Sequence, residues 1–228
     1  MGAGGSEGYY VEKLSGARLR RCYELAPPRV RRYLDAEIEH VASRLRPGDR
    51  VLELGCGYGR ILERLAPKVG FLVGIDTSAQ SLALACELLV GYSNCRLVRM
   101  DAGVLAFDGG VFDAVLCVQN GLSAFKIDRQ RLVSECIRVT RRGGKVLLST
   151  YAERFWEHRL EWFRLQSKEG LVGEIDWTTT RDGVIVCKDG FRATTISANE
   201  FEALAGELGI RRRIEEVDGS SLFCELNV

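Results

Sequence analysis

The chain has 228 residues, of which 46% are hydrophobic and 28% charged, and its formal net charge is +1. This length suits one α/β domain with a full core and is short for two independent domains joined by a linker. A nearly neutral chain has no overall field that would draw it to nucleic acid or to an acidic membrane. The sequence also lacks an apolar run of about 18 residues, the length a membrane-spanning helix needs. We therefore expect neither nucleic acid nor a membrane as a partner.

Cysteine and histidine give little support for a metal site. The eight cysteines form no C-x-x-C pair, and only two histidines are present. A zinc site is therefore not expected, and we predict no metal. The first residues contain no apolar signal core. Together these features predict a cytoplasmic protein whose thiols are reduced and mostly buried.

The first predicted element is an N-terminal helical cap over residues 1–46. Prolines suit a first helical turn, so a helix is expected to begin at Pro27-Pro28 and to run to about Leu45. Its apolar residues recur at helical spacing and predict one buried face. They are Val30, Tyr33, Leu34, Ile38, Val41 and Leu45.

Strands and helices then alternate through a predicted core at residues 47–150. This rhythm implies right-handed crossovers and a parallel sheet with helices on both faces. Strands are expected at 50–54, 71–75, 95–100, 112–118 and 145–150, and helices at 61–65, 78–90 and 128–140.

The alternation stops after residue 150. Residues 151–168 predict an aromatic-rich helix, and residues 171–195 predict short antiparallel strands with turns at Asp182-Gly183 and Asp189-Gly190. We expect this insert, 151–195, to lie on the substrate side. A helix at 197–208 and a hairpin of strands at 210–217 and 221–228 complete residues 196–228, and the whole chain is predicted to be a single domain.

A glycine-rich turn follows the first core strand. Gly55, Cys56, Gly57 and Gly59 stand between this strand and a helix. Glycine allows positive φ and a close approach of ligand to backbone, and the helix start adds free N–H groups. Such a turn would serve several nucleotide-like ligands. However, the dinucleotide fingerprint needs glycine where this chain has Arg60, which opposes a nicotinamide oxidoreductase.

Three acids stand at the ends of three consecutive predicted strands. Glu53 precedes the glycines, where it would repel a pyrophosphate but suits a ligand with an ammonium and a sulfonium. Asp76 is placed to accept hydrogen bonds from ribose hydroxyls, and Asp101 or the next N–H to contact an adenine edge. Two simpler interpretations remain open, namely that Asp76 caps the next helix and that Asp101 is a turn residue.

At these residues the sequence closely resembles the class I S-adenosylmethionine-dependent methyltransferases. The resemblance covers roughly residues 48–150. The runs that carry it are Glu53–Gly59, Gly74–Ser78, Asp101–Ala102, Phe112–Leu116 and Arg142–Val146. It implies a Rossmann-like, doubly wound α/β fold with a seven-stranded, mostly parallel sheet and a reversed last strand.

The resemblance also implies S-adenosylmethionine as cofactor and S-adenosylhomocysteine as product. In that family the glycine loop holds the amino-acid part of the cofactor, the acid after the second strand holds ribose, and the acid after the third contacts adenine. Carried to this chain, the cofactor set is Glu53, Gly55, Cys56, Gly57, Gly59, Asp76, Thr77, Ser78, Asp101, Ala102 and Gln119.

The methyl acceptor is expected to be a small molecule. Residues 117–121 depart from the Asn/Asp-Pro-Pro-Tyr/Phe pattern of enzymes that methylate nucleobase or amide nitrogens. Aromatic residues of the cap and the insert suit a mostly apolar site, although they would serve equally well to pack these segments onto the core. The candidate substrate residues are Tyr9, Tyr10, Tyr23, Asn120 and Trp156.

No catalytic residue is assigned from the sequence. His158 lies in the aromatic helix and is interpreted as a surface residue. The reaction predicted is an in-line displacement, under a cap that closes as a lid. The alternative is a regulator or pseudoenzyme that binds S-adenosylmethionine without turnover.

Overall fold

The computed structural model describes residues 8–228, and the first seven residues of the predicted cap lie outside this range. Its main sheet has the strand order β3-β2-β1-β4-β5-β9-β8. β1 to β5 pair in parallel, whereas β9 is antiparallel to both of its neighbours. The expected doubly wound sheet with a reversed last strand is therefore confirmed. The strands are β1 (Arg50–Leu54), β2 (Phe71–Asp76), β3 (Cys95–Arg99), β4 (Phe112–Cys117), β5 (Thr140–Tyr151), β8 (Arg211–Val217) and β9 (Ser221–Asn227).

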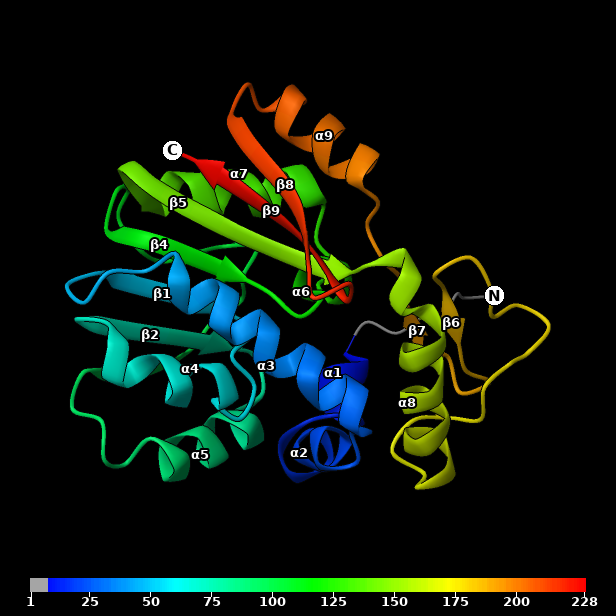
Figure 1. Ribbon diagram of the computed structural model, residues 1–228. Helices are drawn as coiled ribbons and strands as arrows, with labels where there is room; N and C mark the ends of the chain where they lie inside the picture. The colour runs from blue at the N-terminus through cyan, green and yellow to red at the C-terminus, as the bar shows by residue number, and fades with distance from the viewer. Residues whose placement is uncertain (1–7) are drawn as a thin grey trace.

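Helices cover both faces of this sheet (Figure 1). Successive side chains of a strand point to opposite faces, so Val51 and Leu52 of β1 join two different hydrophobic clusters. Val51 faces α3 (Pro28–Ser43), α4 (Arg60–Leu65) and α5 (Ala79–Leu88). Leu52 faces α6 (Gly121–Ala124), α7 (Arg129–Val139) and α9 (Ala198–Glu207). A short 3-10 turn, η1 (Ala66–Lys68), follows α4.

The structure differs from the predicted bounds mainly around β5. This strand begins five residues early, because residues 140–144 continue it past a positive-φ Gly143, with a register shift against β4. It also takes Tyr151, which was expected to start a helix. Ala152 is extended and its N–H donates to the Ser220 carbonyl, so helical structure begins only at η2 (Glu153–Phe155) and α8 (Trp156–Lys168).

The short antiparallel strands expected within 171–195 are confirmed, and they are very short. Within this segment, the structure has two two-residue strands, β6 (Ile185–Val186) and β7 (Arg192–Ala193), paired antiparallel. Elsewhere the chain bonds locally, as where Asp176 accepts from the Thr178 N–H at 2.9 Å. The turn at Asp182-Gly183 does form, with φ of 52° and 77°.

Two short N-terminal helices, α1 (Tyr9–Glu12) and α2 (Gly16–Glu24), pack with the insert. Figure 1 shows them beside α8 and the β6–β7 pair, beyond the end of the sheet at which β2 and β4 terminate. The buried residues shared by these segments form what we call the roof cluster. Its members are Tyr9, Leu14, Cys22, Leu160, Phe163, Leu171, Val172, Ile175, Ile185, Cys187, Phe191 and Ala193.

The eight cysteines are free, and six of them are buried, as expected. Cys86 is exposed and Cys95 half-buried. Among residues 8–228, no helix is both long and apolar enough to cross a membrane.

Candidate active site

A cavity of about 430 Å³ lies under the roof, at the carboxyl ends of β1, β2 and β4. This is the place where open α/β sheets bind ligands, and the volume is within the ~300–1,000 Å³ of small-molecule sites. One part of its wall carries acids and the glycine loop, and another carries aromatic rings. The cavity therefore has the form of a two-part ligand site.

The glycine loop adopts backbone angles that favour glycine. Gly55, Gly57 and Gly59 have φ of 68°, 53° and 89°. A Cβ on Gly55 would also lie 2.7 Å from Cζ of Phe125. Gly55, Cys56 and Gly57 line the cavity, whereas Gly59 lies outside its wall as the N-cap of α4. Gly59 is thus needed for the turn, and the other two glycines leave room for a ligand beside the backbone.

Glu53 is a buried acid on the cavity wall. Its side chain is 3% exposed, and Oε2 is buried without a hydrogen-bond partner. Burial raises the pKa of Glu53 to about 8, nearby Asp76 adds to the rise, and Arg60 opposes it. A ligand with an ammonium group would supply the missing partner and favour the ionised form. The site therefore fits the amino-acid end of S-adenosylmethionine.

Asp76 joins the glycine loop to the start of α5. Its Oδ2 accepts from the Gly57 N–H at 2.9 Å, and its Oδ1 accepts from the Ser78 N–H at 2.8 Å. The helix cap itself is Ser78, whose Oγ accepts from the Ser81 N–H at 3.1 Å. Burial raises the pKa of Asp76 although the backbone bonds oppose the shift. Asp76 lines the cavity together with Thr77 and Ser78. The same carboxylate therefore holds the backbone of the loop and borders the space for a ligand.

Asp101 stands at the next strand end. Its Oδ1 accepts from the Gly103 N–H at 2.7 Å, as in the turn interpretation. Asp101 and Ala102 nevertheless both line the cavity, close in sequence to Met100, which lines it as well. All three acids singled out from the sequence therefore meet at one wall.

The loop after β4 is strained. Gln119 and Asn120 both have positive φ, 55° and 63°, which non-glycine residues rarely adopt. Ser149 holds this turn, because its Oγ accepts from the Gln119 N–H at 2.8 Å and donates in turn to the carboxylate of Glu37. Glu37 is fully buried, and burial raises its pKa to about 7. A buried polar chain thus sets the shape of the loop at the cavity.

The two side chains of this loop have different roles. The Asn120 amide accepts from the Thr150 hydroxyl at 2.8 Å and donates to the Thr194 carbonyl at 2.8 Å, so it holds the structure together. The Gln119 Oε1 accepts from the Tyr23 hydroxyl at 3.0 Å, and the Gln119 side chain also interacts with Glu37, whose pKa it lowers. Gln119 is therefore a lining residue whose side chain is oriented by Tyr23 and Glu37.

Aromatic side chains from three segments form the other part of the wall. Of the predicted substrate residues, Tyr10, Tyr23 and Asn120 line the cavity. Sequence analysis did not single out Tyr151 or Phe191, because their rings meet the others only through the fold. The aromatic lining residues are Tyr10, Tyr23, Tyr58, Phe125, Tyr151, Trp162, Phe163 and Phe191.

Tyr9 and Trp156 do not line the cavity. The Tyr9 hydroxyl donates to Asp189 at 2.6 Å and its ring belongs to the roof cluster, against which Trp156 also packs. The packing interpretation therefore describes these two residues. Trp177 is 53% exposed, and Phe155 is buried against α3, so they contribute no wall either.

Arg60 and the segment 124–127 were missed as lining residues. Arg60 begins α4, its guanidinium lies 5.1 Å from the Tyr23 ring centroid, and its Nε and Nη2 are buried without partners. From the sequence, Arg60 was used only as an argument against a dinucleotide-binding site. α6 has four residues, too few to show a periodic pattern before Phe125. His158 is exposed, as interpreted, and neither histidine lines the cavity.

Residues 51–144 match the model of the methyltransferase domain. Over this stretch, which is less than half of the chain, the protein is similar to methyltransferase domains. The match spans the strands β1 to β4, the glycine loop and all three acids, which line the cavity.

Several similar proteins are also methyltransferases. The chain is 28% identical over 188 residues to the 2-methyl-6-phytyl-1,4-hydroquinone methyltransferase of Synechocystis sp., which covers 72% of this chain and 58% of that protein. It is 31% identical over 114 residues to the ubiquinone biosynthesis O-methyltransferase of Coxiella burnetii, covering 47% and 46%. The chain thus spans about half the length of these curated relatives. The solved DhpI-SAM-HEP complex shares the fold, with a TM-score of 0.67, 22% identity and full coverage of both chains.

Proposed function

We propose that this chain binds S-adenosylmethionine along the polar wall of the cavity and transfers its methyl group to a small molecule held by the aromatic wall. S-adenosylhomocysteine is then the product. The observation that carries the proposal is that the acids, the glycine loop and the aromatic rings line one cavity. The two curated relatives support it, since both are named as methyltransferases of small molecules.

Each end of the cofactor has a matching group. Glu53 pairs with the ammonium, because it is a buried carboxylate without a partner. Gly55 and Gly57 leave room for the amino-acid part beside the backbone. Asp76 accepts from the ribose hydroxyls, and Asp101 with Ala102 borders the adenine. Thr77, Ser78, Cys56 and Gln119 complete this wall.

Transfer is an in-line displacement. The cofactor supplies a methyl carbon made electrophilic by its sulfonium; the acceptor atom forms a bond to this carbon as the carbon–sulfur bond breaks, and the acceptor releases its proton. The residues of the chain align the acceptor and exclude water. Gln119 lines the cavity, and the roof covers the site. Neither histidine lines the cavity, so we assign no histidine as general base.

We also propose a small-molecule acceptor over nucleic acid and a cytoplasmic location. A cavity of about 430 Å³ under a packed roof suits a compact ligand. Eight free thiols suit a reducing compartment.

A labelled-methyl screen tests the proposal. The protein is incubated with S-adenosylmethionine carrying a tritiated methyl group and with pools of small molecules, and label in extracted product is counted. Calorimetry with S-adenosylmethionine and with NAD is run in parallel. We expect binding of S-adenosylmethionine alone and labelled product in at least one pool. Cofactor binding without label in any pool would instead identify a binding regulator, and preference for NAD would reject the cofactor assignment.

A further inference from the structure

Arg60 is a cation of the cavity wall that has no ion pair. It begins α4 directly after the glycine loop, lines the cavity and is half-buried. Within residues 8–228 its guanidinium pairs with no carboxylate, whereas Arg64 of the same helix pairs with Asp35 at 3.0 Å. A positive charge at the wall of a ligand cavity is therefore available to an anionic group.

One nitrogen of the Arg60 guanidinium is accessible from the cavity. Nε and Nη2 are buried and have no hydrogen-bond partner among the described residues. Nη1 also donates no hydrogen bond to residues 8–228, but it is not buried, so it is the donor that a ligand in the cavity can reach. The Tyr23 ring holds the group in place, because its centroid lies 5.1 Å from the guanidinium carbon and its hydroxyl is bonded to Gln119.

Glu53 supplies the opposite charge at the other end of the glycine loop. Glu53 precedes the loop, Arg60 follows it, and both residues line the same cavity. The two groups are near enough for the charge of Arg60 to oppose the rise in the pKa of Glu53. Nevertheless, they form no ion pair with each other, and Oε2 of Glu53 has no hydrogen-bond partner. Both charges are therefore left for a ligand that lies along the loop.

An α-amino acid has the matching pair of charges, because it carries an ammonium and a carboxylate on one carbon. Gly55 and Gly57, between the two side chains in sequence, leave room for such a group beside the backbone. A guanidinium forms strong charge-assisted hydrogen bonds with a carboxylate. A half-buried cation without a partner also loses part of its hydration, and a ligand carboxylate would offset this loss.

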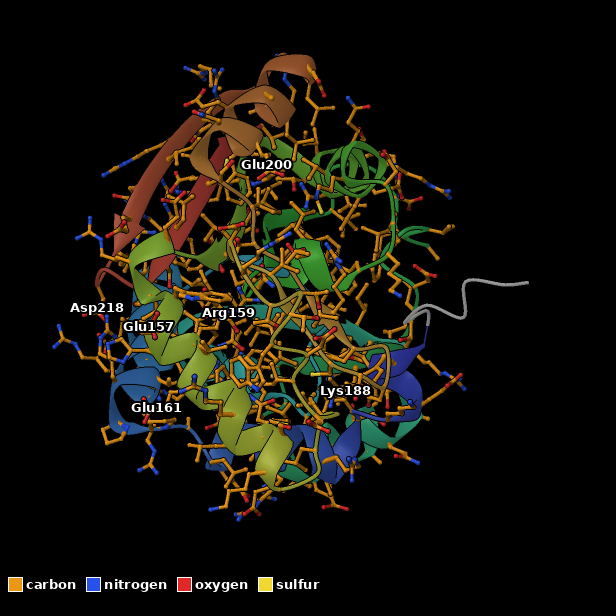
Figure 2. All side chains as sticks on the ribbon, turned by 90° about the vertical axis from the view of Figure 1, so that its right-hand side faces the viewer. Glu157, Arg159, Glu161, Lys188, Glu200 and Asp218 are labelled. Atoms are coloured by element: carbon orange, nitrogen blue, oxygen red, sulfur yellow. The ribbon has the colours of Figure 1, made fainter. Side chains whose placement is uncertain are left out.

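The other cations near the cavity fit this role less well. Lys126 lines the cavity but is exposed to solvent. Figure 2 shows Arg159 extending from α8 toward the middle of the molecule, but Arg159 does not line the cavity, and its Nη1 donates to the Gly183 carbonyl at 2.7 Å. Arg60 is therefore the cation that is both partly buried and accessible to a ligand.

From this arrangement we infer that Arg60 binds the α-carboxylate of S-adenosylmethionine, so that Arg60 and Glu53 together hold the zwitterionic end of the cofactor. The inference rests on the proposed methyl transfer and adds a cofactor-binding residue to it. It also gives the site a means of selection, because adenosyl ligands that lack the carboxylate lose the contact with Arg60.

Two ligands that differ only in the carboxylate test this inference. S-adenosylhomocysteine and its decarboxylated analogue, which keeps the thioether and the amine, are titrated by calorimetry into the wild-type protein and its variants. We expect the wild type to bind S-adenosylhomocysteine about tenfold or more tightly than the analogue, and Arg60→Met to bind the two about equally. Arg64→Met, on the same helix, is the matched control and should keep the wild-type ratio of affinities.

Equal affinity of the wild type for the two ligands, or the wild-type ratio retained in Arg60→Met, would overturn the inference. The ratio is decisive because a purely structural effect of the substitution weakens both ligands by the same factor. If Arg60→Met does not fold, Arg60→Gln removes the charge and keeps a polar side chain, and a wild-type ratio in this variant overturns the inference as well. A wild-type protein that binds neither ligand fails the proposed function, whereas one that binds both equally fails only this inference.

Discussion

Glu53 and Glu37 are buried carboxylates that interact with the site in different ways. Glu53 faces the cavity with an unpartnered oxygen, whereas Glu37 lies behind the wall and accepts from Ser149. Burial raises the pKa of both, to about 8 and about 7. The first is therefore sensitive to a cationic ligand, and the second helps to hold the strained loop at Gln119.

The raised pKa of Glu53 predicts pH-dependent cofactor binding. Below pH 8 the free protein holds a proton on Glu53 that an ammonium ligand must displace. Affinity for S-adenosylmethionine should therefore rise by up to about tenfold per pH unit between pH 6 and 8, with proton release, and level off above pH 8. Calorimetry in buffers of different ionisation enthalpy measures both effects.

Glu53→Gln should weaken binding at pH 8 by about tenfold or more and remove most of the pH dependence. Glu87→Gln, on the exposed face of α5, is the control and should leave both unchanged. If the affinity of Glu53→Gln depended on pH as steeply as that of the wild type, a group other than Glu53 would be taking up the proton.

Gly55→Ala should reduce cofactor affinity by about tenfold or more, because the new Cβ meets Phe125 and the residue must keep a positive φ. Gly91→Ala is the matched control, since a Cβ there meets nothing within 4 Å. Binding isotherms of both variants, with circular dichroism to verify folding, make the comparison. Unchanged affinity in Gly55→Ala would mean that Phe125 yields and that the loop tolerates a side chain.

At the level of single residues, the polar wall could be predicted from the sequence, whereas the aromatic wall could be predicted only in part. Glu53, Asp76 and Asp101 are close in space because parallel strands end at one edge, a consequence of alternation alone. Tyr151 gave no such signal. Its position depends on where β5 ends and α8 begins, and a tertiary bond from Ala152 to Ser220 sets that boundary.

Among the elements, α2 connects the two halves of the site. The Gly16 N–H donates to Ser81 Oγ of α5 at 3.0 Å, and the Arg18 Nη2 donates to the Gly170 carbonyl at 2.6 Å and to the Leu171 carbonyl at 3.0 Å. One helix thus holds the cofactor side and the insert together, which suits the lid predicted from the sequence.

Arg18→Ala should loosen this lid. Its two carbonyl bonds to the insert are lost, so we expect a several-fold rise in KM or in the cofactor Kd and faster proteolysis within residues 170–195, with little change in global stability. Arg20→Ala is the control, because among the described residues Arg20 forms an ion pair only with Glu24 of its own helix. Equal proteolysis of the two variants would argue that α2 is fixed by its apolar contacts alone.

Most elements were predicted within one or two residues, because alternation and capping residues mark their ends. Ser197, for example, caps α9 through a capping box with Glu200. The insert was predicted least well. Its chain bonds through side chains such as Asp176, and local side-chain bonds leave no periodic signal.

For the whole molecule, the raised pKa values of Glu37 and Glu53 predict a free energy of unfolding that depends on pH. Between their usual pKa of 4.5 and about 7 for Glu37 or 8 for Glu53, the folded protein binds more protons than the unfolded chain. The free energy of unfolding should therefore fall as pH rises through this window, by up to about 1.4 kcal/mol per pH unit for each acid. Denaturant unfolding at pH 5.5 and 8 measures the slope, and Glu37→Gln should reduce it.

Cofactor binding should reverse part of this loss. At about 100 times its Kd, a ligand that binds only the folded state adds about 2.7 kcal/mol, or roughly 5–10 °C in Tm for a chain of this size. S-adenosylmethionine and S-adenosylhomocysteine should give this shift in a thermal melt, and NAD should not. A larger shift with NAD would contradict the cofactor assignment.

The roof cluster shares no buried residue with the clusters on the two faces of the sheet, among residues 8–228. Its members come from two separate parts of the chain, one before residue 23 and the other after residue 159. We therefore predict that the roof can be exchanged as a unit. A chimaera that exchanges both roof segments for those of another family member should inherit the donor's acceptor preference while its nucleotide half stays intact, whereas exchanging only one would leave two surfaces that do not match.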